Sequence, residues 1–477
     1  MRNMVVVISD LHFEEEETDI VVATDTGESV ELVRNIPGEA FESMVVDIVG
    51  MARANNAAKI VFILAGDIFD LHRTQLWLAG EERPFVDCSD VGDGSPLEAK
   101  LLSILDAIVR EDNVTDSLDV FRRLQGGKYR AVPGEADSLA DTGLACELRY
   151  MPGNHDRLAN ATAALRRRVR EILGLPLSDD SFVHQFVFAD PPLLIRHGHE
   201  YDKYNYARDL SRGPIAKDLP VEDYGRATFG DFMTVMIASR LPYCFREKYS
   251  EETIANDPVL SALYCRLLQF DDVRPQSSVV DFFLRTQVPT GLRGDYSTDA
   301  WQQKIWNLLE PIVKQLLDEA RRDPFFRGQR WKLLPWYVNV LFALRPWRFG
   351  IPRFFLEVFA WVMKSGSGGD DGGPELSAVR EAALQDGTVR FVAAGHTHQP
   401  QVAHLSTTQG VKTYFTDTGT WRNAVLAAAD NGSYGRVNAT TYVTFYGSDG
   451  GTPPAVARGF EFWSGFDQNW PLDKFDR

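Results

Sequence analysis

The chain is poor in cysteine: four residues in 477, far apart and without a Cys-x-x-Cys pair. This scarcity argues against a disulfide framework and against a thiolate zinc site, and it predicts reduced thiols in a cytoplasmic protein. Negative charge also outweighs positive charge, with 67 Asp and Glu against 50 Lys and Arg. A net charge of -17 at pH 7 disfavours a general nucleic-acid-binding protein, because phosphate backbones require a basic footprint. An acidic protein can still handle phosphates through bound metal ions.

Long apolar runs are missing as well. No stretch reaches the ~20 apolar residues that span a bilayer, and the longest uncharged apolar run, residues 333–344, contains Pro335 and Asn339. The first ten residues form a short apolar run that leads directly to Asp10, so we expect no signal peptide. We find no internal repeat. The sequence therefore predicts a soluble cytoplasmic protein, with peripheral membrane contact as the alternative.

The chain does contain short apolar runs of strand length that alternate with helical patterns. Residues 4–8, 60–64 and 148–151 are continuous apolar or mostly apolar runs, typical of strands covered on both faces. Helical spacing of apolar residues marks 38–55 and 97–124 between them. This β-α-β order predicts an α/β fold with a partly parallel sheet, whose functional sites lie beyond the carboxyl ends of the strands.

The pattern changes after residue 202. Strand signals disappear over 203–365 and helical ones dominate, for example at Trp301, Ile305 and Ile312 behind a cap at Ser297 or Thr298. We therefore expect a discontinuous core of residues 1–202 and 375–477, interrupted by a helical insertion or lid. Residues 366–374 are rich in glycine and are expected to form a flexible linker.

The nine histidines are not scattered. Six of them follow apolar runs and stand beside Asp, Asn or Gly in turns: His12, His155, His197, His199, His396 and His398. Isolated histidines in turns are usually solvated or hydrogen-bonded. The clustering of these six histidines at the ends of predicted strands instead indicates a shared site.

Five polar motifs collect these residues in chain order. They are Asp10-x-His12, Gly66-Asp67, Gly153-Asn154-His155-Asp156, His197-Gly198-His199 and Gly395-His396-x-His398. The set resembles the calcineurin-like metallophosphoesterase family over residues 1 to about 200 and about 388 to 422. The resemblance implies an α/β four-layer sandwich of two mixed β-sheets flanked by helices. To this the present chain would add a large all-helical insertion.

The resemblance also implies a binuclear metal centre. Asp67 would bridge two divalent ions, with manganese expected and iron or zinc as alternatives. The ligands it implies are Asp10, His12, Asp67 and His398 for the first ion, and Asp67, Asn154, His197 and His396 for the second. Two such ions neutralise a phosphate ester and lower the pKa of a bridging water, so that the resulting hydroxide can attack phosphorus in line. The mixed oxygen and imidazole donors suit these metals.

His155 is not carried over as a ligand. The resemblance implies that it faces the phosphate and assists the leaving oxygen, and that Asp156 orients it, which makes these two the expected catalytic residues. Five further residues are expected to support the ligands or to line the substrate pocket: Asp70, His72, Arg73, Arg157 and His199. His199 could also exchange roles with His197, and simple turn polarity explains it equally well.

The expected function is hydrolysis of a phosphoester, either a monoester or a diester, in a phosphorylated small molecule or lipid. A lipid-linked or nucleotide pyrophosphate also fits, and a non-catalytic scaffold of the same fold or a nuclease are the alternatives. Residues 321–364 carry nine basic and two acidic residues among many aromatic ones. That composition fits peripheral membrane contact, but the aromatic residues would also serve as the insertion's own core.

Overall fold

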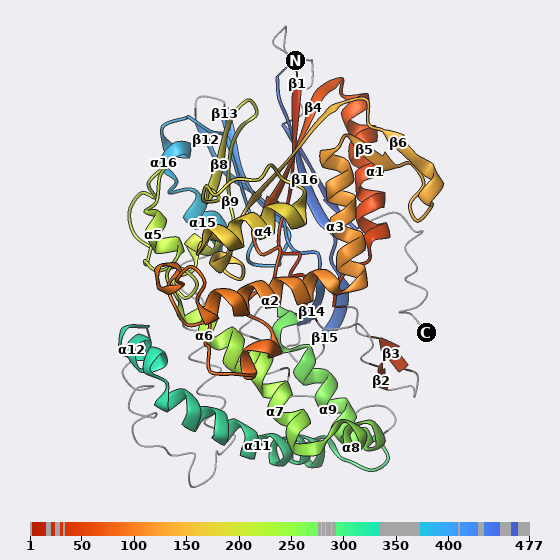
Figure 1. The fold of residues 1–477 in the computed structure, drawn as a ribbon, viewed down its shortest axis with the longest axis vertical. Coiled ribbons are helices and arrows are strands. Elements are labelled where there is room, and N and C mark those ends of the chain that lie inside the picture. The colour runs from red at the N-terminus through yellow and green to blue at the C-terminus, as the bar shows by residue number, and fades with distance from the viewer. Residues whose placement is uncertain are drawn as a thin grey trace.

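The computed structural model describes residues 2–15, 21–23, 29–31, 34–274, 278, 282, 288, 292–333, 373–408, 411–427, 434–448 and 459–465. It is a mixed α/β protein with several sheets, two of them five-stranded and mixed. In Figure 1 these two sheets lie in the upper half, and α7, α8, α9, α11 and α12 lie below them. Most of the basic and aromatic segment and of the glycine-rich linker lies outside the described residues, so neither expectation is tested.

The first five-stranded sheet is formed by both ends of the chain. Its strands in spatial order are Phe460–Ser464 (β17), Thr441–Tyr446 (β16), Arg2–Ile8 (β1), Ala57–Ala65 (β4) and Ala145–Met151 (β7). β1, β4 and β7 run parallel, whereas β16 is antiparallel to β1. The three apolar runs at the start of the sequence therefore form neighbouring parallel strands, as predicted.

The second five-stranded sheet is formed by segments on either side of the insertion. Its strands in spatial order are Gln401–Thr408 (β12), Val411–Asp417 (β13), Phe391–Ala394 (β11), Pro192–Arg196 (β9) and Gln185–Ala189 (β8). β9, β11 and β13 are parallel to one another. β8 and β12 close the two edges as antiparallel strands. β12 was not predicted, because only Val402, Ala403 and Leu405 of its residues are apolar, and Val402 is exposed.

The smaller elements complete the fold. The remaining strands are Val21–Ala23 (β2), Ser29–Glu31 (β3), Lys128–Arg130 (β5), Leu139–Asp141 (β6), Val273–Arg274 (β10), Asn423–Ala427 (β14) and Tyr434–Asn438 (β15). The helices outside 203–365 are Gly38–Ala54 (α1), Pro96–Arg110 (α2), Asp112–Gln125 (α3), Ala163–Leu173 (α4), Pro374–Ala378 (α15) and Ala382–Gln385 (α16). The helical pattern over 97–124 is thus divided into two helices, α2 and α3.

The alternation of side chains along the strands shows how the layers pack. In β1, Val5 and Val7 join an apolar cluster with Leu193 of β9 and Phe391 of β11, so the two sheets face each other. Met4, Val6 and Ile8 point the other way, into the cluster that includes α1 to α4. The second sheet packs its outer face on α15 and α16. A strand buried on both faces needs apolar residues at every position, which explains the continuous runs.

The region 203–365 is predominantly helical in its described part. Its helices are Val221–Tyr224 (α5), Phe229–Met233 (α6), Arg240–Tyr249 (α7), Glu251–Asn256 (α8), Pro258–Leu268 (α9), Thr298–Arg322 (α11) and Pro324–Leu333 (α12), with a π-helical stretch at Thr234–Ser239. They surround their own apolar core, which includes Trp301, Ile305 and Ile312. Ser297 caps α11 by accepting a hydrogen bond from the Ala300 N–H, as predicted.

The expectation of an all-helical insertion is wrong at β10. This two-residue strand pairs in parallel with β14 of the core, Val273 opposite Val425 and Arg274 opposite Leu426. Val425 also enters the apolar core of the helical region. Two residues are too few to give a strand pattern in the sequence. The insertion is therefore joined to the core by backbone pairing close to the predicted site.

Candidate metal centre

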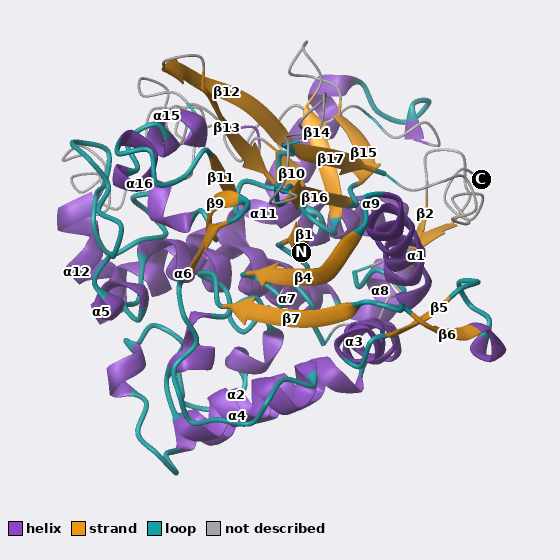
Figure 2. Ribbon diagram, turned by 90° about the horizontal axis from the view of Figure 1, so that it is seen from above, coloured by secondary structure: helices purple, strands orange, loops and turns teal. Residues whose placement is uncertain are grey.

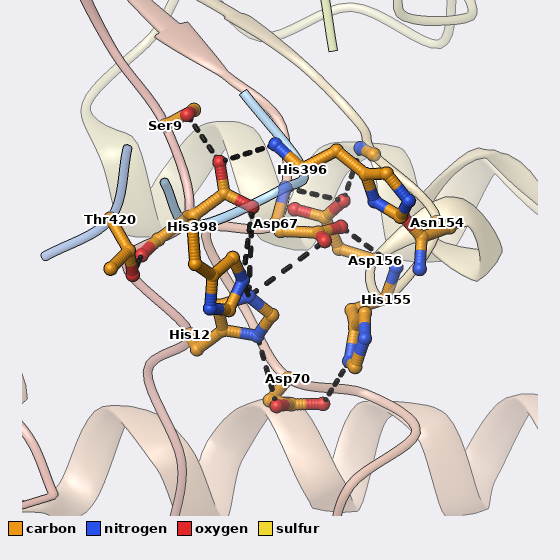
Figure 3. Close-up of polar contacts among 12 residues, drawn as sticks. Ser9, His12, Asp67, Asp70, Asn154, His155, Asp156, His396, His398 and Thr420 are labelled. Carbon is orange, nitrogen blue, oxygen red and sulfur yellow. Dashed lines mark hydrogen bonds and ion pairs between the residues drawn. The ribbon is translucent and has the colours of Figure 1, made fainter. Parts of the chain in front are cut away.

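The predicted ligands lie together at one edge of the two sheets. Each motif follows the carboxyl end of a parallel strand: β1, β4 and β7 in the first sheet, β9 and β11 in the second. Short backbone hydrogen bonds join the turns, from the Asp10 N–H to Gly66 O (3.0 Å) and from the Gly395 N–H to His197 O (2.6 Å). Residues almost 400 positions apart in the sequence thus meet at one place (Figures 2 and 3).

Within the described residues, three overlapping groups of side chains could hold a metal ion. They are Asp10, His12 and His398; His12, Asp67 and His155; and Asp67, His197 and His396. In each group one ligand atom per residue lies within 4.8 Å of the others. Six of the seven predicted ligands belong to these groups, and the seventh, Asn154, places its Oδ1 3.2 Å from His197 Nε2. His155, which was not expected to be a ligand, belongs to the second group.

Asp67 belongs to two of the three groups and links them. Its Oδ1 accepts a hydrogen bond from the His155 N–H at 2.8 Å. Its Oδ2 is buried and has no hydrogen-bond partner, although it lies 3.1 Å from His197 Nε2 and 3.8 Å from His12 Nε2. Asp10 Oδ1 is likewise buried without a hydrogen bond, 3.3 Å from His398 Nε2. Buried carboxylate oxygens without partners are costly, so the donor set fits cations at these places.

The backbone at the ligands is strained. Five of the ligands have positive φ angles although none is glycine: Asp10 (56°), His12 (47°), Asp67 (52°), His396 (73°) and His398 (57°). Each such residue costs on the order of 1–3 kcal/mol and persists only where the surroundings impose it. Only two other non-glycine residues in the described part, Asn56 and Ser250, have positive φ. The left-handed conformations therefore coincide with the candidate site, as expected where turns direct side chains toward one point.

Close backbone packing leaves no room for side chains beside two ligands. A Cβ atom at Gly153 would overlap Asp67 Oδ1, and one at Gly395 would overlap Ser9 Oγ and Asp10 Oδ2. The glycines in the Gly-Asn-His-Asp and Gly-His-Thr-His motifs are thus required by space. They allow the carboxylates to approach the neighbouring turn.

The electrostatics favour positive charge. Burial would lower the pKa of His197, but the carboxylates of Asp67 and Asp10 outweigh it and raise it to about 10. Burial also opposes ionisation of Asp67, yet His197 and His155 hold its pKa below the ordinary value. Closely spaced carboxylates thus stabilise protonated imidazoles in this structure. The same negative potential would attract a divalent cation.

Hydrogen bonds fix the tautomers of two ligands. His197 Nδ1 lies 2.9 Å from Ala65 O and must donate to it, because a carbonyl oxygen only accepts. His396 Nε2 lies 3.3 Å from the carboxylate of Asp202. Each bond leaves the other ring nitrogen without a proton in the neutral imidazole, which is the form that binds metals. Asp202 was not singled out from the sequence, since nothing in its local pattern links it to His396.

The expected role of Asp156 is wrong. Its carboxylate accepts hydrogen bonds from the Gly153 N–H (2.6 Å), the Ile68 N–H (2.9 Å) and the Tyr150 hydroxyl (2.9 Å), so it holds two turns together. His155 instead places Nδ1 2.8 Å from Asp70 Oδ1. The other oxygen of Asp70 lies 3.1 Å from His12 Nδ1. A residue next to a histidine in sequence cannot easily fold back on its ring, whereas Asp70 reaches it from the adjacent strand end (Figure 3).

The remaining expected pocket residues are buried around the site. His199 lies beside the ligands, with its ring centroid 5.2 Å from that of His197, but it belongs to none of the three groups. His72 Nδ1 lies 2.8 Å from the carbonyl oxygen of His155, to which it donates. Arg73 lies within 3.6 Å of the carboxylates of Glu14 and Asp271. These contacts stabilise the turns that carry the ligands.

Arg157 does not line a substrate pocket. Its guanidinium is buried and pairs with Asp231 of α6 at 2.8 Å, and it donates to the carbonyl oxygens of Gly225 and Val86. It therefore joins the core to the insertion. The sequence left open whether Arg157 supports the ligands or lines the pocket, and the contacts of its guanidinium are with Asp231 and with the backbone of Gly225 and Val86.

Within the described ranges, no helix combines the length and the apolar character needed to cross a bilayer. Neither the scan against models of protein families nor the search of curated proteins found a match for this chain.

Proposed function

We propose that this protein is a metal-dependent phosphoester hydrolase of the calcineurin-like metallophosphoesterase family, and that its two facing sheets and flanking helices are that family's four-layer sandwich. The observation that carries the proposal is the position of Asp67. Its buried Oδ2 has no hydrogen-bond partner and lies 3.8 Å from His12 Nε2 and 3.1 Å from His197 Nε2. A carboxylate shared by two adjacent sets of ligands is what a pair of divalent ions requires.

Two divalent ions held by these residues would neutralise phosphoryl oxygens and lower the pKa of a water molecule. Asp10, His12, Asp67 and His398 would hold one, and Asp67, Asn154, His197 and His396 the other. Manganese is the metal we propose first, since oxygen and imidazole donors are mixed in both sets.

His155 is suited to protonate the leaving oxygen. Burial would lower its pKa, but the carboxylates of Asp70 and Asp67 raise it to about 10. Asp70 engages Nδ1, so Nε2 remains for a substrate. A protonated imidazole held by a carboxylate is a general acid, and such acids typically contribute 10²–10⁴-fold to a rate.

The test is hydrolysis of an aryl phosphomonoester and an aryl phosphodiester by metal-stripped protein to which manganese is returned. We expect activity to depend on manganese and to be lost in Asp67→Asn, which keeps the shape of the side chain but not its charge. Metal content, measured by mass spectrometry, should fall from two ions per chain in the wild type to fewer in the variant. Full activity of Asp67→Asn would overturn the proposal.

A wild type that binds two ions but hydrolyses neither ester would instead favour the scaffold alternative. A panel of nucleotides, phospholipids and oligonucleotides would then separate that outcome from a narrow substrate choice. Activity confined to oligonucleotides would favour the nuclease.

A further inference from the structure

An arginine from the insertion contacts one of the candidate ligands. Arg274 of β10 is buried, and its Nη2 lies 2.6 Å from His398 Nδ1. Its Nε donates to the carbonyl oxygen of Thr397 at 3.2 Å. The same side chain is therefore hydrogen-bonded to two consecutive residues of the Gly-His-Thr-His turn. Pairing of β10 with β14 holds it there.

This contact fixes the protonation of His398. A guanidinium only donates hydrogen bonds, so His398 Nδ1 must accept, and in the neutral ring the proton is then on Nε2. That nitrogen faces the candidate metal position, 2.9 Å from His12 Nε2 and 3.3 Å from Asp10 Oδ1. In its neutral form His12 can accept a hydrogen bond from this N–H, because its own Nδ1 lies 3.1 Å from the carboxylate of Asp70 and donates to it. The result is a hydrogen-bonded chain from Arg274 through His398 and His12 to Asp70.

Both histidines of the other set, like His12, have an acceptor at the outer ring nitrogen, so His398 is the exception. His197 donates its Nδ1 proton to Ala65 O, and His396 directs Nε2 at the carboxylate of Asp202. Acceptors on the outer nitrogens leave the inner nitrogens free to bind a cation, and carboxylate partners also strengthen metal binding. Arg274 does the reverse. It places a donor on the outer nitrogen and a positive charge close to the ion.

We propose that Arg274 makes the two metal positions unequal: the Asp10, His12 and His398 position binds its ion more weakly and exchanges it first. The inference rests on the proposed two-metal site. The insertion then sets the metal affinity of the core through Arg274. Its donor at His398 Nδ1 favours the tautomer with a proton on Nε2, and that proton occupies the nitrogen through which His398 would bind the ion. Two backbone carbonyl groups also hold Arg274 in place, since its Nη1 donates to the carbonyl oxygens of Asp271 (2.6 Å) and Val273 (3.0 Å).

The test is calorimetric titration of the metal-stripped full chain with manganese. Wild type should show two classes of site, and His398→Ala should lose the weaker class while keeping the tighter one. Arg274→Met removes the donor and the charge, so it should tighten the weaker class by about tenfold or more, the size typical of changes in residues that support metal ligands. Arg274→Lys keeps the charge and should stay close to wild type.

Asp202→Asn is the matched control at the other position, and it should weaken the tighter class. A single class of two equal sites in wild type would overturn the inference, and so would loss of the tighter class in His398→Ala. These two measurements decide whether the positions are unequal and which of them is weaker, even if Arg274→Met fails to fold, which thermal unfolding would reveal. If Arg274→Met folds and its weaker class of site binds manganese no more tightly than in wild type, the inference is also contradicted.

The proposed function can fail separately. Two unequal classes of site without hydrolysis of any phosphoester would leave the inference standing and remove the function. Hydrolysis of a phosphoester by a protein with two equal sites would support the function and remove the inference.

Discussion

His155 directs its Nδ1 at Asp70, 2.8 Å away, and not at Asp156, its neighbour in the chain. The two aspartates have separate tasks. Asp70 connects the rings of His12 and His155, whereas Asp156 accepts hydrogen bonds from the turns after β4 and β7. Substitution of each should therefore have a different result.

We expect Asp70→Asn to lower kcat for an aryl phosphate by roughly 10²-fold or more, since general acid catalysis contributes 10²–10⁴-fold. The Asp70 carboxylate raises the pKa of His155, so its removal lowers that pKa. The alkaline limb of the pH–rate profile should move to lower pH. Kinetics between pH 6 and 10 would measure both effects. An alkaline limb in the same place would show that Asp70 does not govern His155.

Asp156→Ala should act on folding. The substitution leaves the Gly153 N–H, the Ile68 N–H and the Tyr150 hydroxyl without their acceptor, and each buried group left unpaired costs about 1–3 kcal/mol. Urea unfolding of the metal-stripped protein should show a loss of at least about 3 kcal/mol. Asp70→Asn is the comparison, because an amide can still accept one hydrogen bond. A stable Asp156→Ala protein with an altered pH–rate profile would restore the role that the sequence suggested.

Arg157→Met should destabilise the protein by about 3–5 kcal/mol, because it leaves the buried carboxylate of Asp231 unpaired. KM for a small aryl phosphate should hardly change in protein that remains folded, since the guanidinium is buried and bonded to Asp231 and to backbone carbonyl oxygens. Equilibrium unfolding and steady-state kinetics at low temperature would separate the two effects. A large rise in KM at unchanged stability would place Arg157 in the substrate pocket after all.

Gly153→Ala should weaken metal binding, because the added methyl group would overlap Asp67 Oδ1 and the His197 ring. We expect a loss of affinity for manganese of about tenfold or more, as for other changes that displace ligands. Gly50→Ala is the control, since a Cβ at Gly50 in α1 meets nothing within 4 Å. Titration with manganese would compare the two variants. Equal affinities would mean that the turn moves aside without disturbing Asp67.

His184 should make the protein sensitive to acid. Its ring stacks on Tyr224 at 4.0 Å, its Nδ1 is buried without a partner, and burial lowers its pKa from 6.5 to about 4. The unfolded chain takes up a proton near pH 6.5 whereas the folded chain does so only near pH 4. Stability contributed by neutral His184 is therefore present above pH 6.5 and is lost as the pH falls to 4, by up to about 3 kcal/mol.

His184→Phe keeps a ring on Tyr224 without a titrating group. The difference in unfolding free energy between wild type and His184→Phe should change across pH 6.5 to 4 and be constant above pH 7.5. Urea unfolding at a series of pH values measures it. A difference that does not vary with pH would refute the assignment.

The sequence by itself determined the strands that carry the site and placed a polar motif at the end of each. Continuous apolar runs at residues 4–8 and 60–64 require burial on both faces, and a polar motif directly after each run must lie at the carboxyl edge of a parallel sheet. Asp10, Asp67 and the Gly-His-Thr-His turn could therefore be placed in one region without coordinates. The local sequence was sufficient for this placement because each polar motif directly follows a strand.

Only the tertiary structure decided which side chains act on the ligands. Asp70 on His155, Asp202 on His396 and Arg274 on His398 are contacts between segments whose distance in sequence ranges from 85 to 194 residues. No periodicity encodes them, since each depends on how two sheets and an insertion pack. The same holds for β10, a strand of two residues that exists because β14 offers a free edge. The charge partners at the site depend on how distant segments pack, and no single stretch of the sequence specifies that packing.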